Sequence, residues 1–320
     1  MAKNGGVSRE PRHPIRVVAR RTGITLHVLR AWERRYAVVE PGRTEGGQRL
    51  YSDADIERLK LLRDAVASGR SISQVAPLGE TALAELVAQD RAAGGGAAPT
   101  SEPESGTEIA RYLSASLAAA ERMDDDALHR VLLRALVSLR PLDFIEGLIQ
   151  PLLYEVGERW HRGQLRPSHE HAVSIAVRRV LTFLLSAYEP KADAPTLVTT
   201  TITGDPHEFG AMLASVLAGE AGWRVLYLGA SLPADEIARA AAVSGASAVA
   251  VSAVDDRGAD LLVREFERLR AQLPDRVRLL AGGRAVEQYA TQLAPIAGLE
   301  VIDLQELRER LPAAGGEVVR

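Results

Sequence analysis

The sequence predicts a multidomain chain in which two helical units precede an α/β unit with a doubly wound parallel sheet. Three observations support this fold class. An arginine-rich helical segment comes first, and further helical runs follow a segment of Gly, Ala, Pro, Ser and Glu. The last third alternates short β-branched runs with helical ones, which is typical of parallel sheets. A length of 320 residues suits two or three domains.

The composition excludes several classes of protein. The chain has no cysteine, which excludes a disulfide framework, a thiolate zinc site and a cysteine nucleophile, and fits a reducing compartment. Its first residues are polar and lack the apolar core of a signal peptide. No apolar run approaches the roughly 18 residues of a membrane span. We therefore expect a cytoplasmic protein that has no membrane partner.

The charges are unevenly distributed. Residues 1–70 carry 15 Lys and Arg against 8 Asp and Glu, whereas the remaining residues carry 24 against 34. A basic head on an acidic body indicates nucleic-acid contact at one end. The alternative is a chance cluster of arginines.

The head is predicted over residues 13–91, after a disordered tail at 1–12. The stretch "IRVVARRTGITLHVLRAWERRY" predicts two short helices around "TGIT". Gly23 permits the tight turn and Thr25 can cap the second helix, which is the layout of a helix-turn-helix. The glycines of "EPGRTEGGQRLY" favour a short β wing, and Ser52 is placed to cap a further helix.

Arginines on the second helix can clamp phosphates or read guanine edges, and those of the wing can contact the DNA backbone. A helical surface module without any DNA role is the alternative. The residues predicted to approach DNA are His27, Arg30, Arg34, Arg35, Arg43, Arg49 and Tyr51.

The segments "IRVVARRTGIT", "LRAWERRY" and "GGQRLYSDADIERL" closely resemble the winged helix-turn-helix head of MerR-type transcription regulators. The resemblance covers about residues 13–80. It implies that double-stranded promoter DNA is a partner of the chain. It also implies that five of the residues named above approach DNA, namely Arg34, Arg35, Arg43, Arg49 and Tyr51.

Residues 92–106 are predicted to be a linker, because their composition offers almost nothing to bury. A four-helix bundle is expected over 107–190, since four helical runs are separated by short breaks. Asp124 and Ser168 are candidate N-caps. The four runs are roughly 107–122, 124–139, 141–162 and 168–188.

The α/β unit is expected over 191–320. The runs "TLVTTTI", "RVLYLG", "SAVAVSAV" and "VRLLAGG" are strand-like, and each is followed by a helical stretch. Such a Rossmann-like sheet binds ligands at the carboxyl ends of its strands.

A histidine follows the first of these strands, in "GDPHEFG". One ring nitrogen of His207 can coordinate a metal, while Asp205 accepts a hydrogen bond from the other and fixes the tautomer. Gly210 lets the next helix come close to a ligand. In the alternative interpretation, these three residues only build a surface turn.

The motif Asp-x-His-x-x-Gly, with a serine after the third strand and a glycine pair after the fourth, resembles the cobalamin-binding domain of corrinoid proteins. Here the later motifs are Ser252 with Val254, where leucine is common, and Gly282 with Gly283. The resemblance covers about residues 108–310. It implies that His207 binds cobalt from below and that the small residues line a slot for the cofactor's nucleotide tail.

The bundle contains "ERWHRGQLRPSHEHAVS". Trp160 offers a flat apolar surface, and Glu170 with His171 can hold ribose hydroxyls. Alternatively, Trp160 is bundle core and His161 is a helix-end histidine favoured by the dipole. His169 and His171 diverge by about 200° on a helix, which argues against a shared zinc.

The whole pattern resembles CarH- or LitR-type photoreceptors, which are MerR-type regulators that use adenosylcobalamin. The resemblance implies that Trp160, Glu170 and His171 surround the adenosyl group and that His161 binds cobalt after light. It further implies a non-enzymatic repressor that grips DNA as a dark tetramer and falls apart to monomers in light.

Three alternatives remain from the sequence. The first is a light-independent cobalamin-binding regulator, using adenosyl- or methylcobalamin, that acts through a protein partner. The second is a corrinoid methyl carrier of a methyltransferase, against which the basic head argues. The third is a MerR-type drug or metal sensor, which the lack of cysteine disfavours.

Overall fold

A computed structural model describes residues 8–44, 47–93, 105–188 and 190–311, apart from the side chains of His27, Arg91 and Ser105. The chain divides into two compact units, Met1–Ala187 and Tyr188–Arg320. The head and the bundle both belong to the first unit. Most of the predicted tail and of the predicted linker lies outside the described residues.

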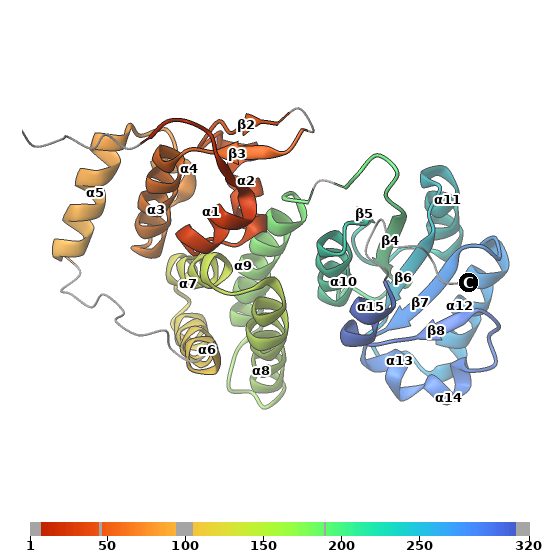
Figure 1. The fold of residues 1–320 in the computed structure, drawn as a ribbon. Helices are drawn as coiled ribbons and strands as arrows, with labels where there is room; N and C mark the ends of the chain where they lie inside the picture. Colours follow the sequence, from red (N-terminus) through yellow and green to blue (C-terminus); the bar gives the residue numbers. More distant parts are fainter. Residues whose placement is uncertain (1–7, 45–46, 94–104, 189, 312–320) are drawn as a thin grey trace, which may run out of the picture. The chain divides into compact units, whose positions relative to one another are not determined.

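The head combines a helix-turn-helix with a small antiparallel sheet (Figure 1). Gly23 ends the first helix with φ 71°, a left-handed conformation that glycine adopts without strain. Ser52 and Asp55 form a capping box at the start of the third helix. The elements are β1 (His13–Pro14), α1 (Ile15–Thr22), α2 (Leu26–Tyr36), β2 (Gly42–Arg43), β3 (Arg49–Tyr51), α3 (Asp53–Ala67), α4 (Ile72–Val75) and α5 (Glu80–Ala93), with strand order β1-β3-β2.

The predicted caps have mixed outcomes. Asp124 caps its helix, because its carboxylate accepts a hydrogen bond from the Ala127 N–H at 2.9 Å. Thr25 occupies the N-cap position of α2 but makes no side-chain capping bond. The prediction for Ser168 is wrong: the last bundle helix begins at Pro167, whose fixed φ suits the first helical position.

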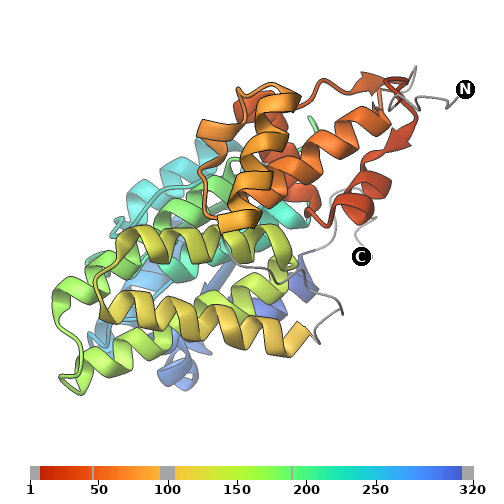
Figure 2. The same cartoon turned by 90° about the vertical axis from the view of Figure 1, so that its left-hand side faces the viewer.

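The bundle helices lie side by side, as Figure 2 shows for the yellow and green segments. The third predicted run is divided, because it opens with a π-helical stretch and becomes α-helical afterwards. Pro151 has no N–H to donate to the carbonyl of Gly147, which interrupts the regular ladder at this junction. The elements are α6 (Ser105–Glu121), α7 (Asp125–Ser138), η1 (Asp143–Ile149), α8 (Gln150–His161) and α9 (Pro167–Leu185).

The second unit confirms the predicted doubly wound sheet. Its five strands are parallel and follow the order β5-β4-β6-β7-β8. The four predicted strands are present, and the sequence reading missed β8. The strands are β4 (Thr196–Thr201), β5 (Arg224–Tyr227), β6 (Ala248–Ser252), β7 (Arg278–Gly282) and β8 (Leu299–Val301).

Helices cover both faces of this sheet (Figure 1). One apolar core contains Ile237 and Phe266 under α11 and α12, and the other contains Leu197 and Trp223 on the side of α10 and α15. The helices are α10 (Phe209–Glu220), α11 (Ala234–Ser244), α12 (Ala259–Gln272), α13 (Arg284–Gln288), α14 (Ala290–Leu293) and α15 (Leu304–Arg310).

The strand order determines where the functional loops lie. The chain goes from β4 outward to β5 and then returns to β6 on the other side of β4, so the winding direction changes between β4 and β6. Thr201 is paired with Ser252 at the carboxyl ends of these two strands. The loops that follow them therefore flank the crevice in which doubly wound folds bind ligands.

Among the residues that the structure describes, no helix is long and apolar enough to span a bilayer.

Candidate functional site

Asp205 is the buried anchor of the loop after β4. Its side chain is 1% exposed, yet both carboxylate oxygens are hydrogen-bonded. Oδ1 accepts from the backbone N–H and from Nδ1 of His207, both at 2.9 Å. Oδ2 accepts from the backbone N–H groups of Val254 at 2.5 Å and Asp255 at 3.1 Å. One carboxylate thus ties the loops after β4 and β6 together and holds the histidine.

These contacts keep Asp205 ionised. Burial by itself would raise the pKa of Asp205. The hydrogen bonds from His207 and from the backbone outweigh this effect and lower the pKa to about 2. The hydrogen bond to Asp205 raises the pKa of His207 against the opposing effect of burial. The carboxylate therefore keeps the proton of the neutral imidazole on Nδ1, and Nε2 carries the lone pair that a metal needs.

His207 is open to a ligand, because its side chain is 51% exposed. Among the described residues, the ring makes its hydrogen bond to Asp205 and its close contact with Asp255 through Nδ1. Ligand atoms of Asp205, His207 and Asp255 lie within 4.8 Å of one another. However, each oxygen of Asp205 already accepts two hydrogen bonds, so the accessible Nε2 of His207 is better placed than the Asp205 carboxylate to serve as a metal ligand.

Ser252 at the end of β6 carries a buried hydroxyl group. Its hydroxyl oxygen has no hydrogen-bond partner within the described part of the chain, although the residue is only 7% exposed. A Cβ built on Gly210 would lie 2.5 Å from this oxygen. The glycine therefore lets α10 approach this hydroxyl closely, and a larger residue at position 210 would clash with it. A bound molecule that hydrogen-bonds there would remove the cost of the unpaired group.

The glycine pair after β7 is explained by the protein backbone itself. A Cβ on Gly282 would lie 2.7 Å from the Ile302 carbonyl oxygen, and one on Gly283 would lie 2.5 Å from that of Ala253. Gly283 also has φ 102°, which favours glycine. The predicted role of these glycines in lining a ligand slot stays a prediction, since close backbone packing already requires them. Val254 contributes the backbone N–H that binds Asp205.

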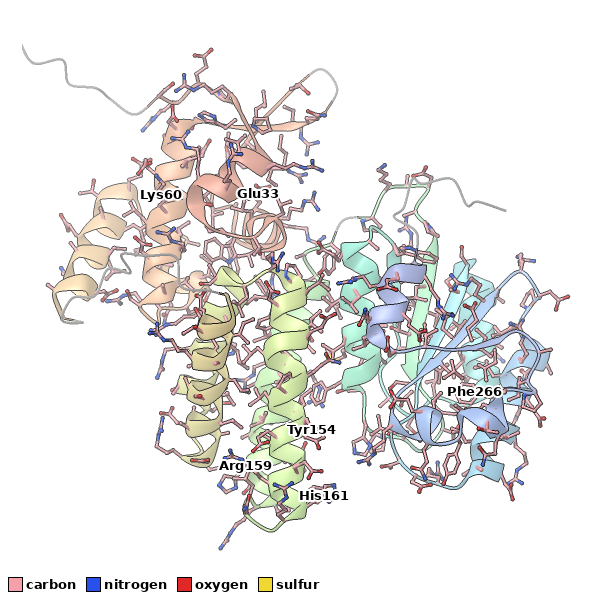
Figure 3. The ribbon with its side chains drawn as sticks, turned by 60° about the horizontal axis from the view of Figure 1, so that its bottom comes forward. Glu33, Lys60, Tyr154, Arg159, His161 and Phe266 are labelled. Atoms are coloured by element: carbon pink, nitrogen blue, oxygen red, sulfur yellow. The ribbon has the colours of Figure 1, made fainter. Side chains whose placement is uncertain are left out.

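The predicted residues of the bundle lie at the ends of two adjacent helices. Trp160 is 41% exposed at the end of α8, so it is not bundle core. Its ring lies 4.8 Å from that of His161, centroid to centroid. At the start of α9, the Glu170 carboxylate binds His171 Nδ1 and the Ser174 hydroxyl, both at 2.6 Å. Figure 3 labels His161 at the end of α8.

The predicted DNA-binding residues differ in accessibility. Arg34, Arg35 and Arg43 are exposed, and Arg30 is half-buried. The guanidinium carbon of Arg35 lies 5.9 Å from the Tyr36 ring centre and 5.5 Å from that of Phe183 on α9. Arg35 is thus engaged by a bundle residue in this conformation. The side chain of His27 lies outside the described residues.

Direct DNA contact by Tyr51 is not supported, because the residue is completely buried. Its hydroxyl donates a hydrogen bond to Glu33. The pKa of Tyr51 is raised, mainly by burial and next by this hydrogen bond. Arg49 pairs with the same carboxylate, its Nε lying 3.2 Å from Glu33 Oε2. Arg49 and Tyr51 therefore fix the wing to α2 through Glu33, which gives Tyr51 a structural role.

Sequence reasoning missed Asp255. Its Oδ1 lies 3.2 Å from Nδ1 of His207, and its side chain is 40% exposed. The only signal was the acidic pair that follows "VSAV". The sequence alone does not place these acidic residues near His207. The pairing of β4 with β6 brings the two loops together.

Comparisons with known proteins agree with this arrangement. The family described as "MerR HTH family regulatory protein" matches residues 14–79, and two families described as "B12 binding domain" match residues 114–185 and 195–309. The chain is 34% identical over 280 residues to the "HTH-type transcriptional repressor CarH" of Myxococcus xanthus, covering 88% of this chain and 91% of that protein.

Two further relatives are informative. The "HTH-type transcriptional repressor CarA" of Myxococcus xanthus is 30% identical over 278 residues, which is 86% of this chain and 88% of that protein. The monomethylamine corrinoid protein of Methanosarcina barkeri aligns with a TM-score of 0.53 and 18% identity, covering 62% of this chain and 96% of that one. The similarity to the corrinoid protein shows a shared fold alone.

Proposed function

Because the chain belongs to the CarH-type family of MerR regulators with a cobalamin-binding domain, we propose that it is a light-dependent transcriptional repressor that uses adenosylcobalamin. The observation that carries the proposal is His207, whose Nδ1 is held by Asp205 while Nε2 is accessible. The buried hydroxyl of Ser252, which has no partner among the described residues, supports it.

The residues of the second unit fit the cofactor. His207 would supply the lower cobalt ligand through Nε2, and Asp205 would hold the ring and keep the Nδ1 proton. Ser252 would hydrogen-bond the nucleotide tail beside Gly210. When bound, adenosylcobalamin supplies a cobalt–carbon bond that visible light can break.

The bundle would contribute the sensing residues. Trp160 is exposed and adjoins His161, so an aromatic surface and an imidazole are available at the same helix end. We propose that Trp160 packs on the adenosyl group in the dark, with Glu170 and His171 beside it. His161 would become the upper cobalt ligand after illumination.

Assembly would convert this local event into release of DNA. A single head makes few phosphate contacts, whereas linked heads bind with a much higher effective concentration. We propose a dark tetramer that holds promoter DNA and dissociates to monomers in light. The two states would differ in how the subunits associate, and the heads themselves need not change.

The exposed arginines of the head give a first prediction. Replacing Arg34 or Arg43 with alanine should weaken DNA binding and reduce the salt slope of log K by about 1 for each lost phosphate contact. Fluorescence anisotropy against salt concentration, with promoter DNA and dark holoprotein, measures this. Arg268→Ala, an exposed arginine of the second unit, is the matched control. An unchanged slope in both head variants would contradict their role.

Size-exclusion chromatography tests the proposed switch. With adenosylcobalamin, the dark protein should elute as a tetramer, and after green light it should elute as a monomer. His161→Ala should still dissociate upon illumination, but its illuminated absorption spectrum should lack the signature of two histidine ligands. An elution volume that is the same in darkness and light would contradict light control and favour the light-independent regulator.

A further inference from the structure

Asp255 stands beside the proposed cobalt ligand without belonging to any of the motifs that the chain shares with corrinoid proteins. Its carboxylate Oδ1 lies 3.2 Å from Nδ1 of His207, and Asp205 Oδ1 lies 2.9 Å from the same nitrogen. The two carboxylates come from different loops, one after β4 and the other after β6. The ring nitrogen is therefore contacted from two strand ends.

The loop that carries Asp255 is held rigidly. The backbone N–H of Asp255 donates to Asp205 Oδ2 at 3.1 Å. The guanidinium of Arg257 donates to the Thr203 carbonyl at 2.5 Å, which fixes this loop to the one after β4. On the other side, Asp256 accepts from the Tyr289 hydroxyl at 2.6 Å and from the Gln288 amide at 3.0 Å. These contacts hold the backbone of Asp255 in place, so its carboxylate is kept near His207.

Asp205 alone leaves the ring less constrained. Its Oδ1 accepts hydrogen bonds from both the backbone N–H and the ring of His207, which is only two positions away. These contacts therefore fix the ring from a single loop. A second acceptor from another strand end restricts the remaining rotation. It also places a second negative charge beside the N–H, which makes the opposite nitrogen a better donor to a metal.

We propose that Asp255 is a positioning residue for the corrinoid, acting as a second acceptor for the Nδ1–H of His207 so that Nε2 is presented to cobalt. This inference rests on the proposed role of His207. Asp255 itself does not bind the metal. Its effect passes through the imidazole, as for other residues behind a metal ligand.

Two variants separate the hydrogen bond from the charge. Asp255→Ala removes the acceptor, so the Kd for hydroxocobalamin should rise by about 10-fold, the lower limit for residues behind a metal ligand because Asp205 remains. Asp255→Asn keeps a carbonyl acceptor, and its Kd should lie between those of Asp255→Ala and wild type. Asp260→Ala, an exposed carboxylate at the start of α12, should bind like wild type.

Electron paramagnetic resonance of ¹⁵N-labelled protein loaded with unlabelled cob(II)alamin separates a histidine nitrogen, which splits each line into a doublet, from the cofactor's own ¹⁴N. It provides a readout that a purely structural role would not move. The fraction of cobalt showing splitting by a histidine nitrogen should fall in Asp255→Ala and be largely restored in Asp255→Asn. If Asp255→Ala matches wild type in both Kd and this fraction, the role of Asp255 is refuted while that of His207 stands. If wild type itself shows no histidine nitrogen, both are refuted.

Discussion

Replacing His207 with alanine should abolish the histidine-ligated absorption spectrum of the holoprotein and weaken cobalamin binding by about 100-fold or more. Removing the ligand itself should cost at least as much as removing a residue behind it, for which losses of about 10- to 100-fold are typical. Titration of apoprotein with hydroxocobalamin, followed by visible absorption, measures both effects. The fold should be retained, because the ring is exposed and contributes little packing.

His169→Ala is the matched control for this variant. His169 lies in the first turn of α9, where its Nδ1 accepts from the Arg166 N–H at 3.2 Å, and it has no proposed contact with the cofactor. It should bind cobalamin with the affinity and spectrum of wild type. If His207→Ala keeps the histidine-ligated spectrum, the lower-ligand assignment is wrong.

Replacing Asp205 with asparagine should have the largest effect on stability. An amide has only one oxygen, so its NH₂ group must face either His207 or the N–H groups of Val254 and Asp255. In either orientation the NH₂ donor meets other donors and leaves them without an acceptor. We expect a loss of about 2–4 kcal/mol, the range for breaking a buried network of this kind. Amide hydrogen exchange in β4 and β6 reports on this unit alone.

The same variant should lose the part of the unit's acid sensitivity that comes from the Asp205 carboxylate. In the folded protein the pKa of Asp205 is about 2, below the ordinary 3.8. Its ionised form therefore stabilises the fold fully above about pH 4, and this contribution, about 2 kcal/mol, is lost as the pH falls from 4 towards 2.

Asp235→Asn serves as the control for Asp205→Asn, because that carboxylate is exposed in the same unit. Its protection from exchange should follow wild type at every pH. Equal pH dependence in Asp205→Asn and wild type would show that the Asp205 carboxylate does not contribute this acid sensitivity.

The sequence predicts residues that act within one loop better than residues that meet across loops. Asp205 and His207 lie two positions apart in a turn after a strand, so their hydrogen bond follows from local geometry. Asp255 lies far along the chain, and its contact depends on the pairing of β4 with β6. No local pattern contains that information.

Alternation along a strand explains why Tyr51 is buried beside α2. Arg49 and Tyr51 lie two residues apart in β3, so they share one face of the strand. That face is turned towards Glu33 of α2, whose carboxylate contacts both. The predicted wing is present. Which of its faces turns inward depends on its packing against α2, and the sequence does not show this.

Short or interrupted elements were also beyond the sequence signal. β8 has three residues with a charged one at its centre, and Glu300 is accommodated because Arg278 on β7 binds both of its oxygens at 2.8 Å. The exposure of Trp160 is likewise a matter of packing, since a tryptophan near a helix end fits either a core or a surface.

If His207 has the proposed role, an imidazole of the protein binds cobalt in place of the cofactor's own benzimidazole. Protein labelled uniformly with ¹⁵N and loaded with unlabelled cob(II)alamin tests this by electron paramagnetic resonance. Each cobalt line should split into a doublet, because ¹⁵N has spin one-half. Triplets from ¹⁴N, which would come from the benzimidazole, or lines without nitrogen splitting would contradict it.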